Sequence, residues 1–263
     1  MVNKLTERNY WDSVYANRDK IPSIILEGYK NHCVREIYRV KERHLSTAQT
    51  VLEIGGGGSS WILYLAEKFP DKQFAVLDYS EKGCELLSNN LKARGIANCD
   101  VWVEDFFHTS KGVEKFDFVY SHGVVEHFED LSSVLRAHGR FLKKNGIMLT
   151  IIPNMAGILG LFTKWLNRSV YDIHVRHDLA SFKQGHCEAG LEIIESGYLC
   201  SHNFSVLSSC VSPGDGWKWE LYKALSRLSK AIWFFEDKLF SLPATKLISP
   251  YIYVVSKKTN GYS

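Results

Sequence analysis

Residues 51–59 read V-L-E-I-G-G-G-G-S, and this stretch decides the fold of the chain. The apolar residues predict a buried strand, and the glycines predict a tight turn into a helix, because glycine bends freely and lets a ligand approach bare backbone. A second strand ends in V-L-D-Y, which places Asp78 about 20 residues after the turn, where a carboxylate can accept hydrogen bonds from both ribose hydroxyls. The stretch therefore predicts a pocket for a ligand that contains a nucleoside.

Length and composition favour one folded domain. The chain has 263 residues, and single α/β domains commonly reach about 250 residues. A hydrophobic content of 45% and a charged content of 23% are typical of folded proteins. The net charge of +3 comes without a basic stripe, so we expect no nucleic-acid partner.

The cysteines and the apolar stretches bear on the cellular location. The six cysteines form no C-x-x-C pair, which predicts neither a zinc knuckle nor a disulfide framework and fits a reducing cytosol. The N-terminus has no apolar core, and the apolar stretch 146–162 is broken by Pro153 and Asn154. We therefore expect neither a signal peptide nor a membrane span, and a cytoplasmic protein.

The hydrophobic pattern alternates between strands and helices through the middle of the chain. Strands that are apolar throughout, such as F-D-F-V-Y and I-M-L-T-I-I, belong in a parallel sheet that is covered on both faces. The pattern predicts a doubly wound α/β fold. The predicted elements are strand 50–54, helix 59–69, strand 73–77, helix 81–94, strand 100–104, strand 116–121, helix 130–143, strand 146–152, helix 178–189, strand 191–208 and strand 250–256.

The flanking segments complete a single domain that spans residues 1–263. We predict a helical N-terminal cap at 1–46, a core at 47–210 and 248–257, and an amphipathic helical insert at 211–247.

The glycine turn narrows the choice of nucleoside ligand. The dinucleotide fingerprint G-x-G-x-x-G fails, since its third glycine position is Ser60 or Trp61, depending on the start. No G-K-[ST] follows the glycines, so a nucleoside triphosphate held by a phosphate loop is equally unsupported. A nucleoside cofactor without phosphates remains.

A series of motifs in the same region resembles the class I S-adenosylmethionine-dependent methyltransferases. The first motif of that family, E/D-x-G-x-G-x-G, matches at Glu53, Gly55 and Gly57, with Ser59 in place of the last glycine. The match continues through Asp78, D-F-F at 105–107, F-D-F-V-Y-S-H-G-V-V-E-H-F at 116–128 and L-K-K-N-G-I-M-L-T-I-I-P at 142–153. The resemblance implies a Rossmann-like seven-stranded sheet whose last strand, P-Y-I-Y-V-V-S, runs antiparallel beside the fifth.

The resemblance also implies S-adenosylmethionine as the cofactor and S-adenosylhomocysteine as the product. Asp78 would hold the ribose, Asp105 the adenine amine and Phe106 the adenine ring, while Glu53 would organise the turn and act indirectly on the amino group. The predicted cofactor-binding residues are Glu53, Gly55, Gly56, Gly57, Asp78, Tyr79, Asp105, Phe106, Ser121, His122 and Trp11.

Three residues are candidates for the base that a hydroxyl acceptor requires, namely Glu126, His127 and His174. Glu126 and His127 lie in a segment similar to E-V-x-E-H-V of ubiquinone-biosynthesis O-methyltransferases, where acidic and histidine positions can hold a divalent ion. Gly123 replaces the first acid, so we expect no metal site. The alternatives are that Glu126 caps a helix or pairs with a cation, that His127 packs against it, and that His174 is a surface loop residue.

Two amphipathic segments are expected to cover the domain. The N-terminal helix, with Arg8, Tyr10, Trp11 and Tyr15, is expected to close over the cofactor as a lid, or else simply to pack on the domain. Residues 217–240 form an apolar helical stripe that we expect to pack on the sheet or over the active site; a homodimer contact or membrane-surface association is the alternative. The stripe consists of Trp217, Leu221, Leu225, Leu228, Ile232, Phe235 and Leu239.

The sequence thus predicts a cytoplasmic methyltransferase that modifies a hydroxyl, or in second place an amine, of a small-molecule or glycan-linked acceptor. One alternative is a non-catalytic protein that binds S-adenosylmethionine or acts as a scaffold. The other is a methyltransferase of RNA or protein. The segment S-H-G-V stands where an N/D-P-P-[YF] motif would follow the fourth strand, and no basic patch is present, which counts against this last alternative.

Overall fold

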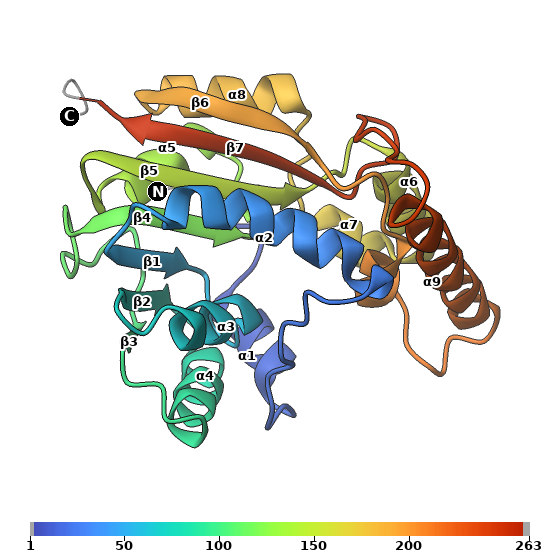
Figure 1. Cartoon of the computed structure of the whole chain (residues 1–263), viewed down its shortest axis with the longest axis horizontal. Helices are drawn as coiled ribbons and strands as arrows, with labels where there is room; N and C mark the ends of the chain where they lie inside the picture. The colour runs from blue at the N-terminus through green and yellow to red at the C-terminus, as the bar shows by residue number, and fades with distance from the viewer. Residues whose placement is uncertain (1–2, 260–263) are drawn as a thin grey trace.

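A mixed sheet of seven strands forms the centre of the molecule, for which the computed structural model describes residues 3–259 (Figure 1). The strand order is β3-β2-β1-β4-β5-β7-β6. Strands β1 to β5 are parallel, and β7 runs antiparallel between β5 and β6, as predicted for the Rossmann-like fold. The strands are β1 (Thr50–Ile54), β2 (Gln73–Asp78), β3 (Cys99–Val103), β4 (Phe116–His122), β5 (Leu142–Pro153), β6 (Leu191–Leu199) and β7 (Tyr251–Lys258).

Helices cover both faces of the sheet because side chains alternate between the faces along each strand. In β1, Val51 packs in the core under α2 (His32–Leu45), α3 (Ser60–Lys68) and α4 (Glu81–Ala93). The next residue, Leu52, packs in the opposite core under α5 (Leu131–Gly139) and α8 (Leu179–Glu188). This arrangement confirms the prediction of strands buried on both faces.

The glycine turn between β1 and α3 has the shape that its sequence demands. Gly55 adopts φ +73°, a left-handed conformation that side chains disfavour. Ser59, the residue that replaces the family's last glycine, caps α3: its side chain accepts from the backbone N–H groups of Trp61 and Ile62 at 3.1 and 3.2 Å. The substitution therefore serves the start of the helix.

The N-terminal cap is less helical than predicted. Among its described residues, 3–46, only α1 (Arg8–Tyr15), the short 3-10 helix η1 (Tyr29–Asn31) and α2 are helical, whereas residues 16–28 form an irregular connection. Pro22 explains the interruption, since proline lacks a backbone N–H and disfavours a helix at the residue before it. The connection runs along α4, where the side chain of Asn90 accepts from the backbone N–H of Ile21 at 3.2 Å.

The predicted end of the sixth strand and the prediction of no disulfide are wrong. The strand predicted at 191–208 ends at Leu199, and the chain continues as the 3-10 helix η3 (Phe204–Cys210). In addition, Cys200 forms a disulfide with Cys33 of α2, with a Cα–Cα distance of 5.5 Å, although the cysteine spacing predicted no disulfide framework. The two cysteines are 167 residues apart, so only the fold brings them together.

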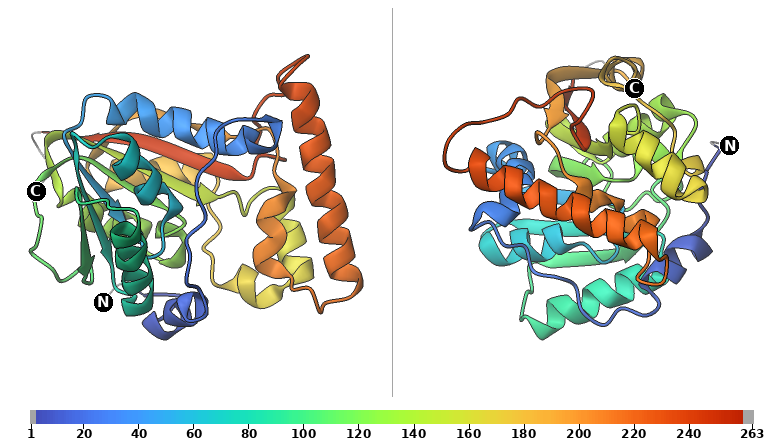
Figure 2. Two further views of the ribbon diagram at one scale, coloured as in Figure 1. Left: turned by 60° about the horizontal axis from the view of Figure 1, so that its bottom comes forward. Right: turned by 90° about the vertical axis from the view of Figure 1, so that its right-hand side faces the viewer.

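Helix α9 (Trp217–Glu236) lies beyond the end of the sheet, near α6 (Ile158–Leu166) and α7 (Arg168–Asp172) (Figures 1 and 2). The expectation that the whole apolar stripe of 217–240 packs on the domain is wrong, because Trp217, Leu228 and Phe235 of α9 and Leu239 after it are exposed. The alternative, a homodimer or membrane-surface contact, stays a prediction. The buried residues of α9 are instead Ser226, Ser229, Trp233 and Glu236. Hydrogen bonds hold these four residues against the domain. Ser229 accepts from the backbone N–H of Phe204 at 2.9 Å, and Glu236 accepts from the Ser201 hydroxyl at 2.8 Å.

The described helices also bear on the membrane prediction. Within residues 3–259, no helix is both long and apolar enough to span a bilayer.

Candidate active site

A cavity of about 120 Å³ opens at the carboxyl ends of β1, β2 and β4. Ligands of open α/β sheets bind at this edge, where the strand order reverses. The lining residues come from the N-terminal segment, the glycine turn, the end of β2, the segment after β3 and the segment after β4. They are Thr6, Trp11, Tyr15, Gly55, Leu77, Asp78, Tyr79, Phe106, His122, Gly123, Val124, His127 and Phe128.

Asp78 is held in the cavity wall by the glycine turn. One carboxylate oxygen accepts from the backbone N–H of Gly57 at 2.8 Å, and the other accepts from the backbone N–H of Ser80 at 2.8 Å. Burial raises the pKa of Asp78, and these backbone hydrogen bonds oppose that rise. Two backbone donors leave acceptor capacity on a carboxylate, which is what a ribose diol requires. A Cβ on Gly57 would lie 2.9 Å from the Asp78 carboxylate, so glycine permits this contact.

A buried polar group lies beneath the turn. Glu53 accepts from the Tyr120 hydroxyl at 2.8 Å, and Lys41 of α2 places its Nζ 3.5 Å from the centre of the Tyr120 ring. Burial lowers the pKa of Lys41 and raises that of Glu53, and the attraction between the two groups opposes both shifts. Lys41 was missed by the sequence analysis, because a lysine in a helix normally faces water.

Asp105, which was predicted to bind the adenine amine, already accepts hydrogen bonds from the protein. The Asp105 carboxylate accepts from Lys4 Nζ at 2.8 Å and from the backbone N–H of Phe107 at 2.9 Å, and Asp105 does not line the cavity. Burial is the largest single influence and raises the pKa of Asp105, but the hydrogen bonds from Lys4 and the backbone of Phe107, together with the charge of Lys4, outweigh it, so the pKa lies below its usual value. Phe106 lines the cavity and stacks on His138 with ring centres 4.7 Å apart.

The N-terminal segment closes the cavity from outside. Trp11 donates from Nε1 to Thr6 Oγ1 at 3.1 Å, and its ring meets the His127 ring edge-on at 5.3 Å. Tyr15 packs against the turn, since a Cβ on Gly58 would lie 2.7 Å from its ring. Binding sites for molecules of cofactor size usually enclose about 300 Å³ or more. The N-terminal segment thus covers the cavity, and its role as a lid that opens for the cofactor stays a prediction.

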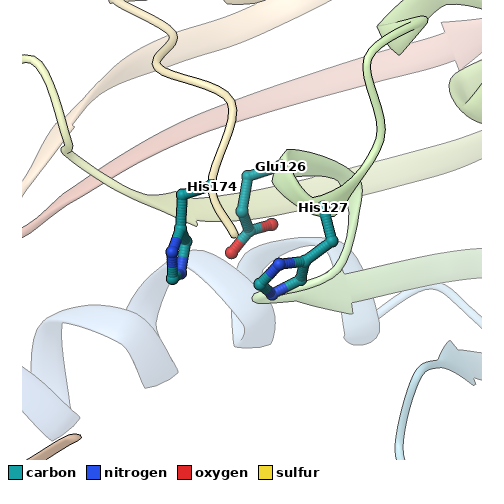
Figure 3. A group of neighbouring side chains, drawn as sticks. All are labelled: Glu126, His127 and His174. Atoms are coloured by element: carbon teal, nitrogen blue, oxygen red, sulfur yellow. The ribbon is translucent and has the colours of Figure 1, made fainter. Parts of the chain in front are cut away.

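Glu126, His127 and His174 meet beside this cavity, as Figure 3 shows. Their potential ligand atoms all lie within 4.8 Å of one another. Glu126 and His127 belong to the 3-10 helix η2 (Val125–His127), and His174 follows α7. The backbone joins the two segments, because the N–H of Val175 donates to the carbonyl of Glu126 at 2.7 Å.

The environment of the cluster sets its protonation. Burial raises the pKa of Glu126 to about 8. Burial, helped by the charge of His174, lowers the pKa of His127 to about 4, and burial also lowers the pKa of His174. Both imidazoles are therefore neutral at neutral pH, as a proton acceptor or a metal ligand must be.

The structure brings many of the predicted site residues together. Of the predicted cofactor-binding residues, Gly55, Asp78, Tyr79, Phe106, His122 and Trp11 line the cavity. Glu53, Gly56, Gly57, Asp105 and Ser121 do not line it. Lining residues absent from the predicted set are Thr6, Tyr15, Leu77, Gly123, Val124 and Phe128. All but Thr6 had a signal, since Tyr15 belongs to the predicted lid and the other four lie in the quoted motifs.

The fold and this site define a Rossmann-like enzyme domain with a nucleoside-cofactor cavity. The family model described as "Methyltransferase domain" matches residues 45–189, which is more than half of the chain. The chain therefore belongs to the S-adenosylmethionine-dependent class I methyltransferases, and S-adenosylmethionine is its cofactor.

A curated relative is also named a methyltransferase, and solved structures share the fold. The chain is 26% identical over 136 residues to EEF1A lysine methyltransferase 2 of Danio rerio, covering 47% of this chain and 55% of that protein, so it spans about half of that relative's length. The [4+2]-cyclase SpnF has a similar fold, with a TM-score of 0.65 at 12% identity, and the match covers 98% of this chain and 97% of that one. Coclaurine N-methyltransferase bound to N-methylheliamine and SAH has a TM-score of 0.58 at 15% identity, covering 86% and 72%.

Proposed function

We propose that this protein transfers the methyl group of S-adenosylmethionine to the oxygen of a hydroxyl group on a small-molecule or glycan-linked acceptor. The observation that carries the proposal is the cluster of Glu126, His127 and His174 beside the cofactor cavity. A hydroxyl must lose its proton as it attacks the methyl group, so it needs a polar cluster of this kind at the reaction point.

The reaction is an in-line displacement at the sulfonium. A lone pair of the acceptor oxygen forms the new O–C bond, the C–S bonding pair returns to sulfur, and S-adenosylhomocysteine leaves. The acceptor proton passes to His174, the half-buried member of the cluster. Its Nδ1 lies 2.7 Å from the Val170 carbonyl, which accepts the Nδ1 proton, so Nε2 carries the free lone pair.

The rest of the site positions the cofactor and excludes water. Asp78 would hold the ribose while Trp11 and Tyr15 close over the cavity. Closure of this kind aligns the reacting atoms and protects the sulfonium from solvent.

The test is a screen of hydroxylated metabolites and sugar nucleotides for acceptor-dependent formation of S-adenosylhomocysteine. With an acceptor in hand, His174→Ala should lower kcat by about 100-fold or more, the usual contribution of a positioned base. His44→Gln is the matched control, because His44 lies at the end of α2, near the start of β1, whereas the cavity lies at the carboxyl ends of the strands. Full activity of His174→Ala would contradict the assignment of the base.

A protein lysine is the second candidate acceptor, and the name of the Danio rerio relative favours it. An amine is also a nucleophile that must reach the sulfonium uncharged. Incubation with denatured and native protein mixtures, followed by mass spectrometry of methyl-lysine, tests this candidate. Methylation of protein without turnover of any hydroxylated compound would replace the first proposal by the second.

A further inference from the structure

We propose that the outer face of α9, together with η1, binds the surface of a lipid bilayer that contains anionic phospholipids. The outer face consists of the exposed residues Arg227, Leu228, Lys230, Phe234 and Phe235. Such binding is independent of which acceptor receives the methyl group.

The outer face lies at the rim of the molecule, beyond the end of the sheet (Figures 1 and 2). The residues that hold α9 on the domain follow one side of the helix, and they are Ser226, Ser229, Trp233 and Glu236. Because a helix turns about 100° per residue, the outer face points the opposite way. The apolar surface continues past the helix, where Leu239 is 72% exposed and Phe240 is 50% exposed. Exposed apolar side chains that lie together mark an interaction surface.

A groove of about 320 Å³ lies between η1 and α9. The Tyr29 and Phe234 rings meet edge-on across it, with centres 5.3 Å apart. Within the described part of the chain, no acidic residue lines the groove. Its basic and aromatic lining residues are Tyr29, Lys30, Arg227, Lys230, Phe234 and Phe235. Basic groups beside aromatic rings suit a phosphate with an apolar chain attached, because the cations bind the phosphate oxygens while the rings cover the chain.

The basic groups of the groove are available to such a phosphate. Arg227 and Lys230 form no ion pair with any residue in the range 3–259. Lys238, which follows the helix, lies over the Phe234 ring at 4.3 Å, so its ammonium group stays beside the groove. An unpaired basic group at the surface gives up little when it binds a phosphate.

The acidic residues of α9 and of its C-terminal end do not cancel this charge. Glu236 is buried against the domain. Asp237 pairs with Arg35 of α2, and Glu220 pairs with Lys223 at 2.7 Å. The outer face therefore keeps the positive charge of its own basic groups, which attracts an anionic surface.

This combination of side chains favours a bilayer over a second copy of the chain. Helices that join Trp, Phe and Leu on one part of their surface with Lys and Arg beside them bind anionic membranes. A symmetric dimer would place the same face of both copies together, so the basic groups of two grooves would meet without acids between them. Toward a bilayer, each basic residue instead strengthens binding about fivefold.

The experiment is cosedimentation of the full chain with vesicles of phosphatidylcholine alone and with vesicles of phosphatidylcholine and phosphatidylglycerol in equal amounts. We expect binding to the mixed vesicles, weaker binding to phosphatidylcholine alone, and a loss of binding as salt rises. The double variant Arg227→Ala/Lys230→Ala should bind the mixed vesicles about 25-fold more weakly. Phe235→Ser/Leu239→Ser should bind about tenfold more weakly, because two apolar side chains no longer enter the lipid.

Lys92→Ala/Lys144→Ala is the matched control. It removes the same charge from exposed positions on α4 and at the start of β5, away from α9 (Figure 1). This variant should bind the mixed vesicles like the wild type. Circular dichroism and binding of S-adenosylhomocysteine show that each variant is folded.

Three results would overturn the proposal. The first is no binding of the wild type to the mixed vesicles at low salt. The second is an equal loss of binding in Arg227→Ala/Lys230→Ala and in the control, which would reduce the effect to net charge. The third is a dimer in sedimentation velocity that Phe235→Ser/Leu239→Ser dissociates, since a second copy would then cover the outer face.

Discussion

Asp78→Asn tests the position of the cofactor most directly. The carboxylate lies in the cavity wall, and each of its oxygens already accepts one backbone N–H at 2.8 Å. An asparagine keeps the shape but replaces one oxygen by an NH2 group, which cannot accept. One ribose hydroxyl and one backbone N–H therefore lose their acceptor.

The expected loss follows from these hydrogen bonds. A hydrogen bond to a charged group contributes about 1.5–3 kcal/mol. Loss of one ribose contact should therefore weaken binding of S-adenosylhomocysteine by about 10- to 150-fold. The backbone N–H left without a partner should also lower the free energy of unfolding by about 1–3 kcal/mol.

Isothermal titration calorimetry with S-adenosylhomocysteine measures the affinity, and urea unfolding measures the stability. Asp117→Asn is the matched control, because Asp117 accepts from the backbone N–H groups of Thr50 and Gln49 at 2.9 and 3.1 Å, at the opposite edge of the sheet. This variant should lose stability but keep its affinity. Equal affinities of wild type and Asp78→Asn, or an equal loss in both variants, would refute the placement of the ribose.

Three further predictions concern the turn, the lid and a buried histidine. Gly55→Ala should cost about 2–5 kcal/mol of stability in urea unfolding, since φ is +73° and the new Cβ would overlap Val124; Val124→Ala should restore only the part due to overlap. Trp11→Ala should speed dissociation of S-adenosylhomocysteine about tenfold in stopped-flow experiments, because about 1–2 kcal/mol of lid contacts is lost; an unchanged rate would argue against a lid. Burial lowers the pKa of His138 from 6.5 to about 3. Below pH 6.5 the unfolded chain therefore binds a proton at this histidine that the folded protein does not bind, so the free energy of unfolding decreases as the pH falls. His138→Phe should therefore lose about 2 kcal/mol less than wild type between pH 8 and pH 5, and equal losses would contradict the shift.

Local sequence patterns identified the strands, the glycine turn and Asp78. The run that ends in Glu53 and the glycines after it predicted both the strand and the turn, because these features depend on neighbouring residues. The same holds for Asp78, whose distance along the chain from the turn reflects one strand-helix-strand unit. The wrong end of the strand at 191–208 shows the limit, since apolar residues after Leu199 pack around α9 rather than in the sheet.

The sequence by itself determined the class of fold and the family, because both depend on short-range periodicity and spacing. Only the tertiary structure decided which distant residues meet. It joined His174 to Glu126, paired Lys4 with Asp105, and placed Lys41 beneath the turn. These contacts depend on how helices and loops pack against the sheet, and no local pattern in the chain encodes that packing.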